Sequence, residues 1–224
     1  MKKIIAILLV FVLVLPMCII PASAETEKEI TFRGIPFGTS YTETIAALKE
    51  QGIEFDKDPY FNKEETGYCI ASSNAPIEVE VAGHTMELEV NFVHPDLANN
   101  MDPKVEDCVF YRGRYSYRRK ADDSKDYNEL VIKLTSLYGD PVYDNTWKPD
   151  DLKARWENDD VQIDLKAQYL IYQNPIYGHG DQTIRIDYTW KKGETMYSQN
   201  SAWYREKMER ERENQILSTG TGGL

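Results

Sequence analysis

The sequence predicts an α+β fold of two tandem units, each a helix packed on one face of an antiparallel sheet, followed by a polar C-terminal helix. Apolar residues recur at helical spacing after Ser40 and again after Asp126. Each helical segment is followed by strands in which apolar and polar residues alternate. The two helix starts lie 86 residues apart, so we interpret residues 25–122 and 123–192 as a duplicated unit.

In the first unit, Ser40 and Glu43 have the spacing of a capping box, which predicts a helix that ends near Gly52. A strand is expected at residues 67–72. The clearest strand signal lies at residues 77–92, where apolar residues alternate with glutamates on both sides of a glycine-containing turn. This pattern predicts a hairpin with one buried face. Residues 109–119 form a further strand that extends the first sheet.

In the second unit, a helix is expected from Asp126 to residue 138, because Gly139 and Pro141 end the apolar pattern. Three strands follow, the first around Trp156 and the others at residues 161–167 and 184–190. Trp156 and Trp190 alternate with polar neighbours, so we expect both in the core.

The chain ends in two segments without an apolar stripe. Residues 194–217 have a helical but mostly polar pattern, and residues 218–224 are rich in glycine. We therefore expect a polar helix followed by a disordered tail.

The first 24 residues have the three parts of an export signal. Lys2 and Lys3 precede an apolar run from residue 4 to 15, and a site of small residues ends at Ala24. We expect cleavage after Ala24 and a mature protein that is secreted or associated with the cell envelope. Cys18 would be the site of a lipid anchor if the leader were of the lipoprotein type.

The mature chain is strongly acidic. Loss of Lys2 and Lys3 with the leader leaves 24 basic and 37 acidic side chains, a net charge of −13. This charge repels nucleic-acid phosphates and anionic lipids, so we expect neither a nucleic-acid partner nor stable membrane insertion. The two cysteines that remain, Cys69 and Cys108, are expected to form a disulfide, with two buried thiols as the alternative.

Several short motifs resemble those of exported bacterial proteins with a helix-plus-sheet repeat. They are residues 32–40 (FRGIPFGTS) and, in the second half, Leu134, residues 137–141 (LYGDP), Trp156, residues 163–165 and residues 186–188. The repeat is similar to that of β-lactamase inhibitory proteins and of the small lipoprotein of the outer-membrane β-barrel assembly machinery. The resemblance covers about residues 30–190 and implies a tandem fold and a binding role. Met17 stands before Cys18, where lipoprotein signals carry a small residue, and no inhibitor contact residue maps onto this chain.

An arginine stripe is the main candidate binding feature. Arg112, Arg114 and Arg118 fall on one face of the strand at residues 109–119, and Tyr111, Tyr115 and Tyr117 fall on the other. A stripe of glutamates on the hairpin lies nearby: Glu78, Glu80, Glu87 and Glu89. Either the arginines neutralise these glutamates on a solvated face, or Arg112, Arg114, Arg118 and Tyr115 contact a partner. Trp147, in a polar loop, is a further candidate contact.

No assembled catalytic set is recognisable. We interpret His84 and His94 as exposed loop residues, and no histidine has the spacing of a metal-binding pair. His179, between two glycines and beside Asp181, is the most enzyme-like position. The sequence thus predicts a non-enzymatic binding or inhibitor-like module without metal or cofactor, acting on a protein or cell-envelope component. The alternatives are an extracytoplasmic hydrolase centred on His179 and an envelope assembly factor.

Overall fold

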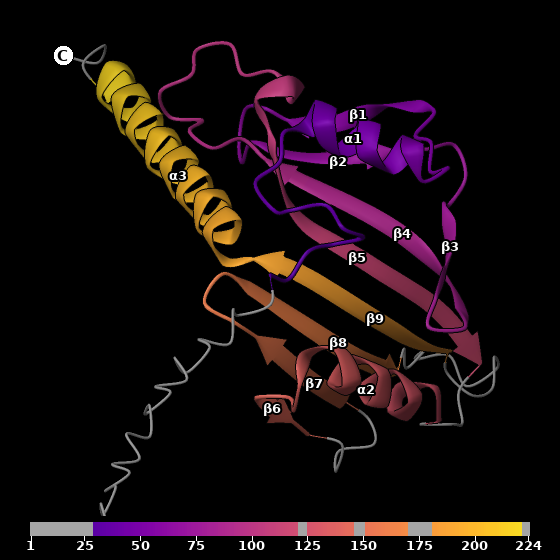
Figure 1. The fold of residues 1–224 in the computed structure, drawn as a ribbon. Coiled ribbons are helices and arrows are strands. Elements are labelled where there is room, and N and C mark those ends of the chain that lie inside the picture. The colour runs from indigo at the N-terminus through magenta and orange to yellow at the C-terminus, as the bar shows by residue number, and fades with distance from the viewer. Residues whose placement is uncertain (1–28, 121–124, 146–150, 170–180, 221–224) are drawn as a thin grey trace, which may run out of the picture.

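The structure, a computed structural model, describes residues 29–120, 125–145, 151–169 and 181–220. In these residues three helices pack against one nine-stranded antiparallel sheet (Figure 1), which confirms the predicted fold class. The first half contains α1 (Tyr41–Glu50), β1 (Lys57–Asn62), β2 (Tyr68–Ser72), β3 (Glu78–Val81), β4 (His84–Val93), a 3₁₀ turn (Val105–Asp107) and β5 (Val109–Lys120). The second contains α2 (Lys125–Tyr138), β6 (Tyr143–Asp144), β7 (Asp151–Glu157), β8 (Val161–Tyr169), β9 (Asp181–Trp190) and α3 (Lys191–Gly220).

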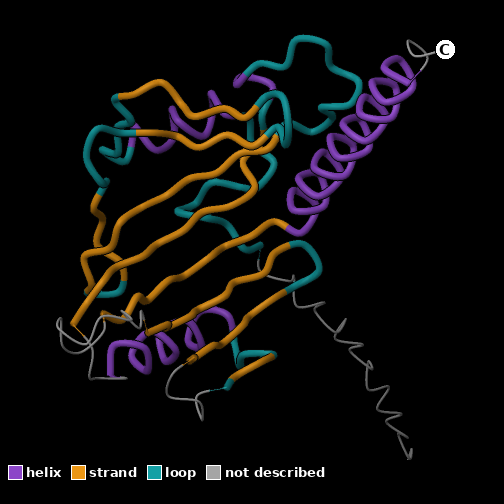
Figure 2. The backbone as a smooth tube through the Cα atoms, turned by 180° about the vertical axis from the view of Figure 1, so that it is seen from behind, coloured by secondary structure: helices purple, strands orange, loops and turns teal. Residues whose placement is uncertain are grey.

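The sheets of the two units are joined edge to edge. The strand order is β1-β2-β4-β5-β9-β8-β7-β6, with β3 beside β4, so the last strand of the first unit pairs with the last strand of the second. The views from the front and from behind place α1 and α2 on the same face (Figures 1 and 2). Each half of the chain therefore contributes one helix and several strands to one sheet with a shared two-layer core.

Local signals explain the elements of the first unit. The Ser40 hydroxyl accepts a hydrogen bond from the Glu43 amide, and the Glu43 carboxylate accepts one from the Ser40 amide, which completes the predicted capping box. Val81 pairs with His84, so β3 and β4 are joined by a two-residue turn. Its residues Ala82 and Gly83 have φ values of 57° and 90°, and such left-handed turns match the twist of a hairpin.

Aromatic side chains from both units fill the centre of the core. Phe32 stacks on Tyr115 at a centroid distance of 4.8 Å and meets Tyr188 edge-on at 5.5 Å. Gly113 on β5 pairs with Tyr188 and lies against the Phe32 ring. It leaves room for this packing, because a Cβ atom at this position would lie 2.5 Å from the ring. Trp156, predicted to be a core residue, is 1% exposed.

The C-terminal helix differs from its predicted bounds. α3 begins at Lys191, directly after β9, and continues to Gly220, so the expected tail is helical over its first three residues. Gly193 lies in the first turn of α3 beside Tyr111, where a Cβ atom would overlap the Tyr111 side chain, so no larger residue would fit. No helix in the described part of the chain is both long enough and apolar enough to span a membrane.

The Gly113 packing gives a test of this core. Gly113→Ala should lower the free energy of unfolding by about 1–3 kcal/mol, because the new methyl group overlaps the Phe32 ring. Urea denaturation measures the change, with Ser116→Ala on the opposite face of the same strand as the control. In a Phe32→Ala background the Gly113→Ala penalty should nearly disappear. An equal penalty in both backgrounds would show that Phe32 is not the group that excludes a side chain.

Candidate functional site

The sheet has an uncovered polar face opposite α1 and α2, which we call the open face. Apolar side chains of β4, β5, β7, β8 and β9 point into the core, and alternate residues of the same strands point to the open face. The open face carries Glu87, Glu89, Asn91, Arg112, Arg114, Ser116, Arg118, Arg155, Gln162, Asp164, Lys166, Arg185 and Asp187. The start of α3 lies over one end of this face, where Arg112 Nη2 is 3.1 Å from Glu194 Oε2. The loop of residues 73–76 borders Glu87, Glu89 and Ser116 at a pocket of about 360 Å³.

An ion-pair ladder crosses the centre of the open face from β4 to β9. Arg114 Nη1 lies 3.1 Å from Glu89 Oε1, and Arg114 Nε lies 2.6 Å from Asp187 Oδ1. On the other side of Asp187, Arg185 Nε lies 2.8 Å from Oδ2, without the alignment of a hydrogen bond. Burial disfavours the charged form of Arg114, yet Asp187 and Glu89 raise its pKa above the ordinary value. The arginine therefore stays charged and fixed in position.

A second group of paired charges continues the ladder across β8 and β7. Asp164 Oδ1 lies 2.7 Å from Arg155 Nε, and Asp164 Oδ2 lies 3.4 Å from Lys166 Nζ. Gln162 donates a further hydrogen bond to the same carboxylate at 2.7 Å. Burial alone would raise the pKa of Asp164, but Arg155 and Lys166 lower it below the usual range. The centre of the open face thus carries paired, charged side chains that hold one another in place.

The structure separates the predicted site residues. Arg112, Arg114 and Arg118 share the open face as predicted, and Arg118 is exposed at the end far from α3. Tyr115 is only 6% exposed and lies in the core against Phe32, so its inclusion in a contact surface with the arginines is wrong. Side chains alternate along β5, so a residue next to Arg114 points to the opposite face. Trp147 lies outside the described residues.

Tyr111 was expected to share a face with Tyr115, and this is also wrong. The pairing of β4 with β5 shifts register after Asn91, because β5 contains one extra residue at a bulge. Tyr111 consequently lies beside Arg112, whose guanidinium carbon is 5.2 Å from the Tyr111 ring centroid. The tyrosine ring stacks on Tyr197 of α3. The bulge therefore supplies the aromatic contact that anchors α3 to the open face.

Cys69 and Cys108 are both fully buried and are free thiols in this structure. The neighbouring Cys69 thiol and burial raise the pKa of the Cys108 thiol well above its ordinary value, and Cys108 Sγ lies 3.7 Å from the carbonyl oxygen of Lys104. The predicted pair is therefore brought together in space. Strand β4 lies between β2, which carries Cys69, and β5, which begins directly after Cys108. The disulfide itself stays a prediction.

Asn200 on α3 is a structural residue that the sequence analysis missed. Its amide nitrogen donates to the carbonyl oxygens of His94 at 2.8 Å and Thr66 at 3.1 Å, and its carbonyl oxygen accepts from the Leu97 amide at 3.3 Å. Only 4% of Asn200 is exposed. One side chain thus fastens α3 to two loops. The sequence did contain a signal for this position. Met196 lies four residues before Asn200 and Trp203 three residues after it, so both share its face of the helix and indicate that this face packs against the protein.

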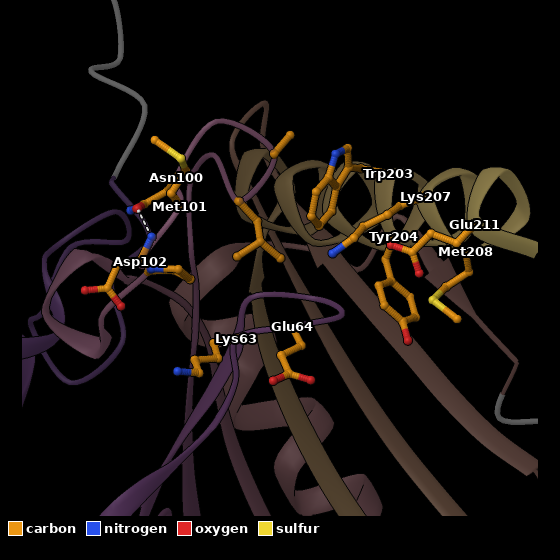
Figure 3. Close-up of a pocket in the computed structure, with 13 residues that line it drawn as sticks. Lys63, Glu64, Asn100, Met101, Asp102, Trp203, Tyr204, Lys207, Met208 and Glu211 are labelled. Carbon is orange, nitrogen blue, oxygen red and sulfur yellow. Dashed lines mark hydrogen bonds between the residues drawn. The ribbon is translucent and has the colours of Figure 1, made fainter. Parts of the chain in front are cut away.

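Next to Asn200 lies a groove of about 620 Å³, which we call the α3–loop groove (Figure 3). It is formed by the turn at Lys63 and Glu64, by the loop of residues 97–103, and by α3 from Trp203 to Glu211. Met101 projects from the loop and is fully exposed. Lys207 Nζ lies 5.4 Å from the Trp203 ring centroid. Aromatic, thioether and charged side chains of these kinds are common at protein contact surfaces.

The two described histidines have structural surroundings. His94, expected in an exposed loop, is 3% exposed, and its Nδ1 accepts a hydrogen bond from the Asp96 amide at 3.1 Å. Burial lowers the pKa of His94, although Asp107 and Asp96 act in the opposite direction. The His84 ring stacks on Tyr117 at 5.6 Å. His179, the centre of the hydrolase alternative, lies outside the described residues.

No group of three histidine, cysteine or acidic side chains is arranged to hold a metal ion within the described part of the chain. Searches of protein-family models, curated proteins and solved structures give no match to this chain. The resemblance to the inhibitory proteins and the assembly lipoprotein therefore stays a prediction.

Asn200 gives a test of the link between α3 and the loops. Asn200→Ala should lower the free energy of unfolding by about 1–3 kcal/mol, because the buried His94 carbonyl, the half-buried Thr66 carbonyl and the Leu97 amide lose their partner. Hydrogen exchange at the Leu97 amide should become faster. Gln199→Ala, at an exposed neighbouring position, is the matched control. Unchanged protection of Leu97 would show that Asn200 does not fasten the loop.

His94 predicts a pH dependence of stability. Its pKa is lower in the folded protein than the ordinary 6.5, so the unfolded chain binds the proton more tightly. The contribution of His94 is complete above pH 6.5 and is lost as the pH falls through the folded pKa. Unfolding free energies measured at several pH values should show this loss in the native chain but not in His94→Gln. His84→Gln is the control and should retain it. The same slope in His94→Gln would assign the effect to other groups.

Proposed function

We propose that this protein is a non-enzymatic module that binds a protein partner outside the cytoplasm through the open face of its sheet. The main support is the ion-pair ladder that holds Glu89, Arg114, Asp187 and Arg185 in fixed positions on a face that α1 and α2 leave uncovered. The partner would be a protein because the acidic chain disfavours nucleic acid and anionic lipid.

The ladder suits a binding surface because its side chains are already ordered. Binding costs conformational entropy when long side chains become fixed, and this cost is lower where they are held beforehand. Arg114 retains 22% of its side-chain exposure, so its outer edge faces a partner while Asp187, 8% exposed, lies beneath it. Charges that are paired within the protein also need no new counter-charge when water is displaced.

The same observations have a plainer interpretation, in which the ladder is only the solvated outer surface of the sheet. Exposed ion pairs contribute little to stability, about 0–1 kcal/mol each, so such a surface would tolerate substitution. The two interpretations differ in what lies against Ser116, which sits between Arg114 and Arg118 on β5. Solvent would cover it in one case and a partner protein in the other.

Site-specific photo-cross-linking separates the two. A photoreactive amino acid at Ser116 should give a discrete cross-linked species when the chain is produced in its own cells. The same group at Ile132, 68% exposed on α2, should not give that species. Arg118→Glu combined with the Ser116 probe should weaken the cross-link several-fold by reversing one charge beside it.

Identification of the cross-linked protein by mass spectrometry would name the partner. A Ser116 probe that captures only what the Ile132 probe captures would refute binding through the open face. The binding module proposal would then require another surface.

A further inference from the structure

The second half of α3 extends beyond the sheet (Figure 1). Residues 191–204 are fastened by the Arg112–Glu194 ion pair, the Tyr111–Tyr197 stack and the hydrogen bonds of Asn200. Every residue at 205–214 is exposed. We call this segment the α3 overhang. At 1.5 Å per residue, its ten residues are about 15 Å long.

A helix that no other element supports is weakly stable in water. Isolated helices shorter than about 12–15 residues are marginal, and most helices in proteins are stabilised by packing of one face. The overhang continues an anchored helix, which removes the cost of nucleation, but none of the described elements packs against it. A partner helix would supply this packing.

The overhang has no net charge, although the protein as a whole is acidic. Residues 205–214 contain four basic side chains, Arg205, Lys207, Arg210 and Arg212, and four acidic ones, Glu206, Glu209, Glu211 and Glu213, whereas the whole chain has a net charge of −11. Two copies of such a chain repel each other over most of their surfaces. The overhang is a place where they approach without that repulsion.

The overhang also borders the α3–loop groove. Lys207, Met208 and Glu211 line the groove, and Figure 3 shows them on the same stretch of α3 as Trp203 and Tyr204. Lys207 and Glu211 are one helical turn apart and carry opposite charges. Two such helices in antiparallel orientation place Lys207 of each near Glu211 of the other, and this arrangement also opposes the helix dipoles favourably.

We propose that two copies of this chain associate through α3, with the overhangs antiparallel across a twofold axis and each lying along the α3–loop groove of the other. A twofold contact uses the same surface twice, so it requires a self-complementary patch. The lysine and glutamate one turn apart provide this complementarity, because each copy contributes both members. Met208 and the exposed Met101 supply adaptable apolar contacts at its centre.

Sedimentation equilibrium of the purified chain tests the proposal by charge reversal and rescue. The native chain should show a concentration-dependent dimer. Lys207→Glu and Glu211→Lys should each raise the dissociation constant of the dimer about tenfold or more, because each places like charges opposite one another twice. The double variant Lys207→Glu/Glu211→Lys should restore association to near the native value.

Arg205→Glu is the matched control, because it makes the same change in net charge two positions from Lys207, on the other side of the helix. It should weaken the dimer much less than Lys207→Glu. Circular dichroism should show the same helix content in all variants.

A native chain that stays monomeric at its highest soluble concentration would overturn the proposal. A dimer that Lys207→Glu, Glu211→Lys and Arg205→Glu leave unchanged would place the interface elsewhere and overturn it as well. Loss of the dimer without rescue in the double variant would refute the antiparallel pairing. None of these outcomes affects the Ser116 cross-linking experiment, so the two proposals fail or succeed separately.

Discussion

The pairing of β5 with β9 is the constraint on which the rest of this structure depends. These strands are hydrogen-bonded in unbroken register from the Arg112–Thr189 pair to the Lys120–Asp181 pair. The register unites two helix-and-strand units in one sheet, sets Arg114 directly opposite Asp187, and lets Phe32 pack against side chains from both units. Because β9 continues directly into α3, the same pairing also determines where the C-terminal helix lies.

The ion-pair ladder on the open face contributes more to fixing the register between β5 and β9 than to the stability of the fold. A partly exposed ion pair contributes at most about 1 kcal/mol, and a buried pair often only offsets its own desolvation. A slip of one residue between β5 and β9 would move Arg114 into the core and Tyr115 into solvent, which costs far more. Charge pairing and apolar burial thus select the same alignment.

Much of the fold was predictable because its signals are local. The capping box at Ser40, the two-residue turn before His84 and the alternation along each strand depend on neighbouring residues alone. The bulge at Tyr111, the burial of His94 and the role of Asn200 depend on contacts between segments far apart in the chain. The spacing of apolar residues along the sequence does not predict such contacts. The candidate site was therefore only partly predicted: the arginines and the nearby Glu89 were placed correctly, but the contacts of the arginines with Asp187 and with α3 were not.

The position of β9 near the end of the chain has a consequence during synthesis. The first unit, from α1 to β5, leaves the ribosome with all its local partners, yet the outer edge of β5 stays open until residues 181–190 have been made. An unpaired edge strand is a template for intermolecular pairing, and slow closure prolongs that exposure. Binding of the nascent chain by a chaperone before β9 appears would protect that edge.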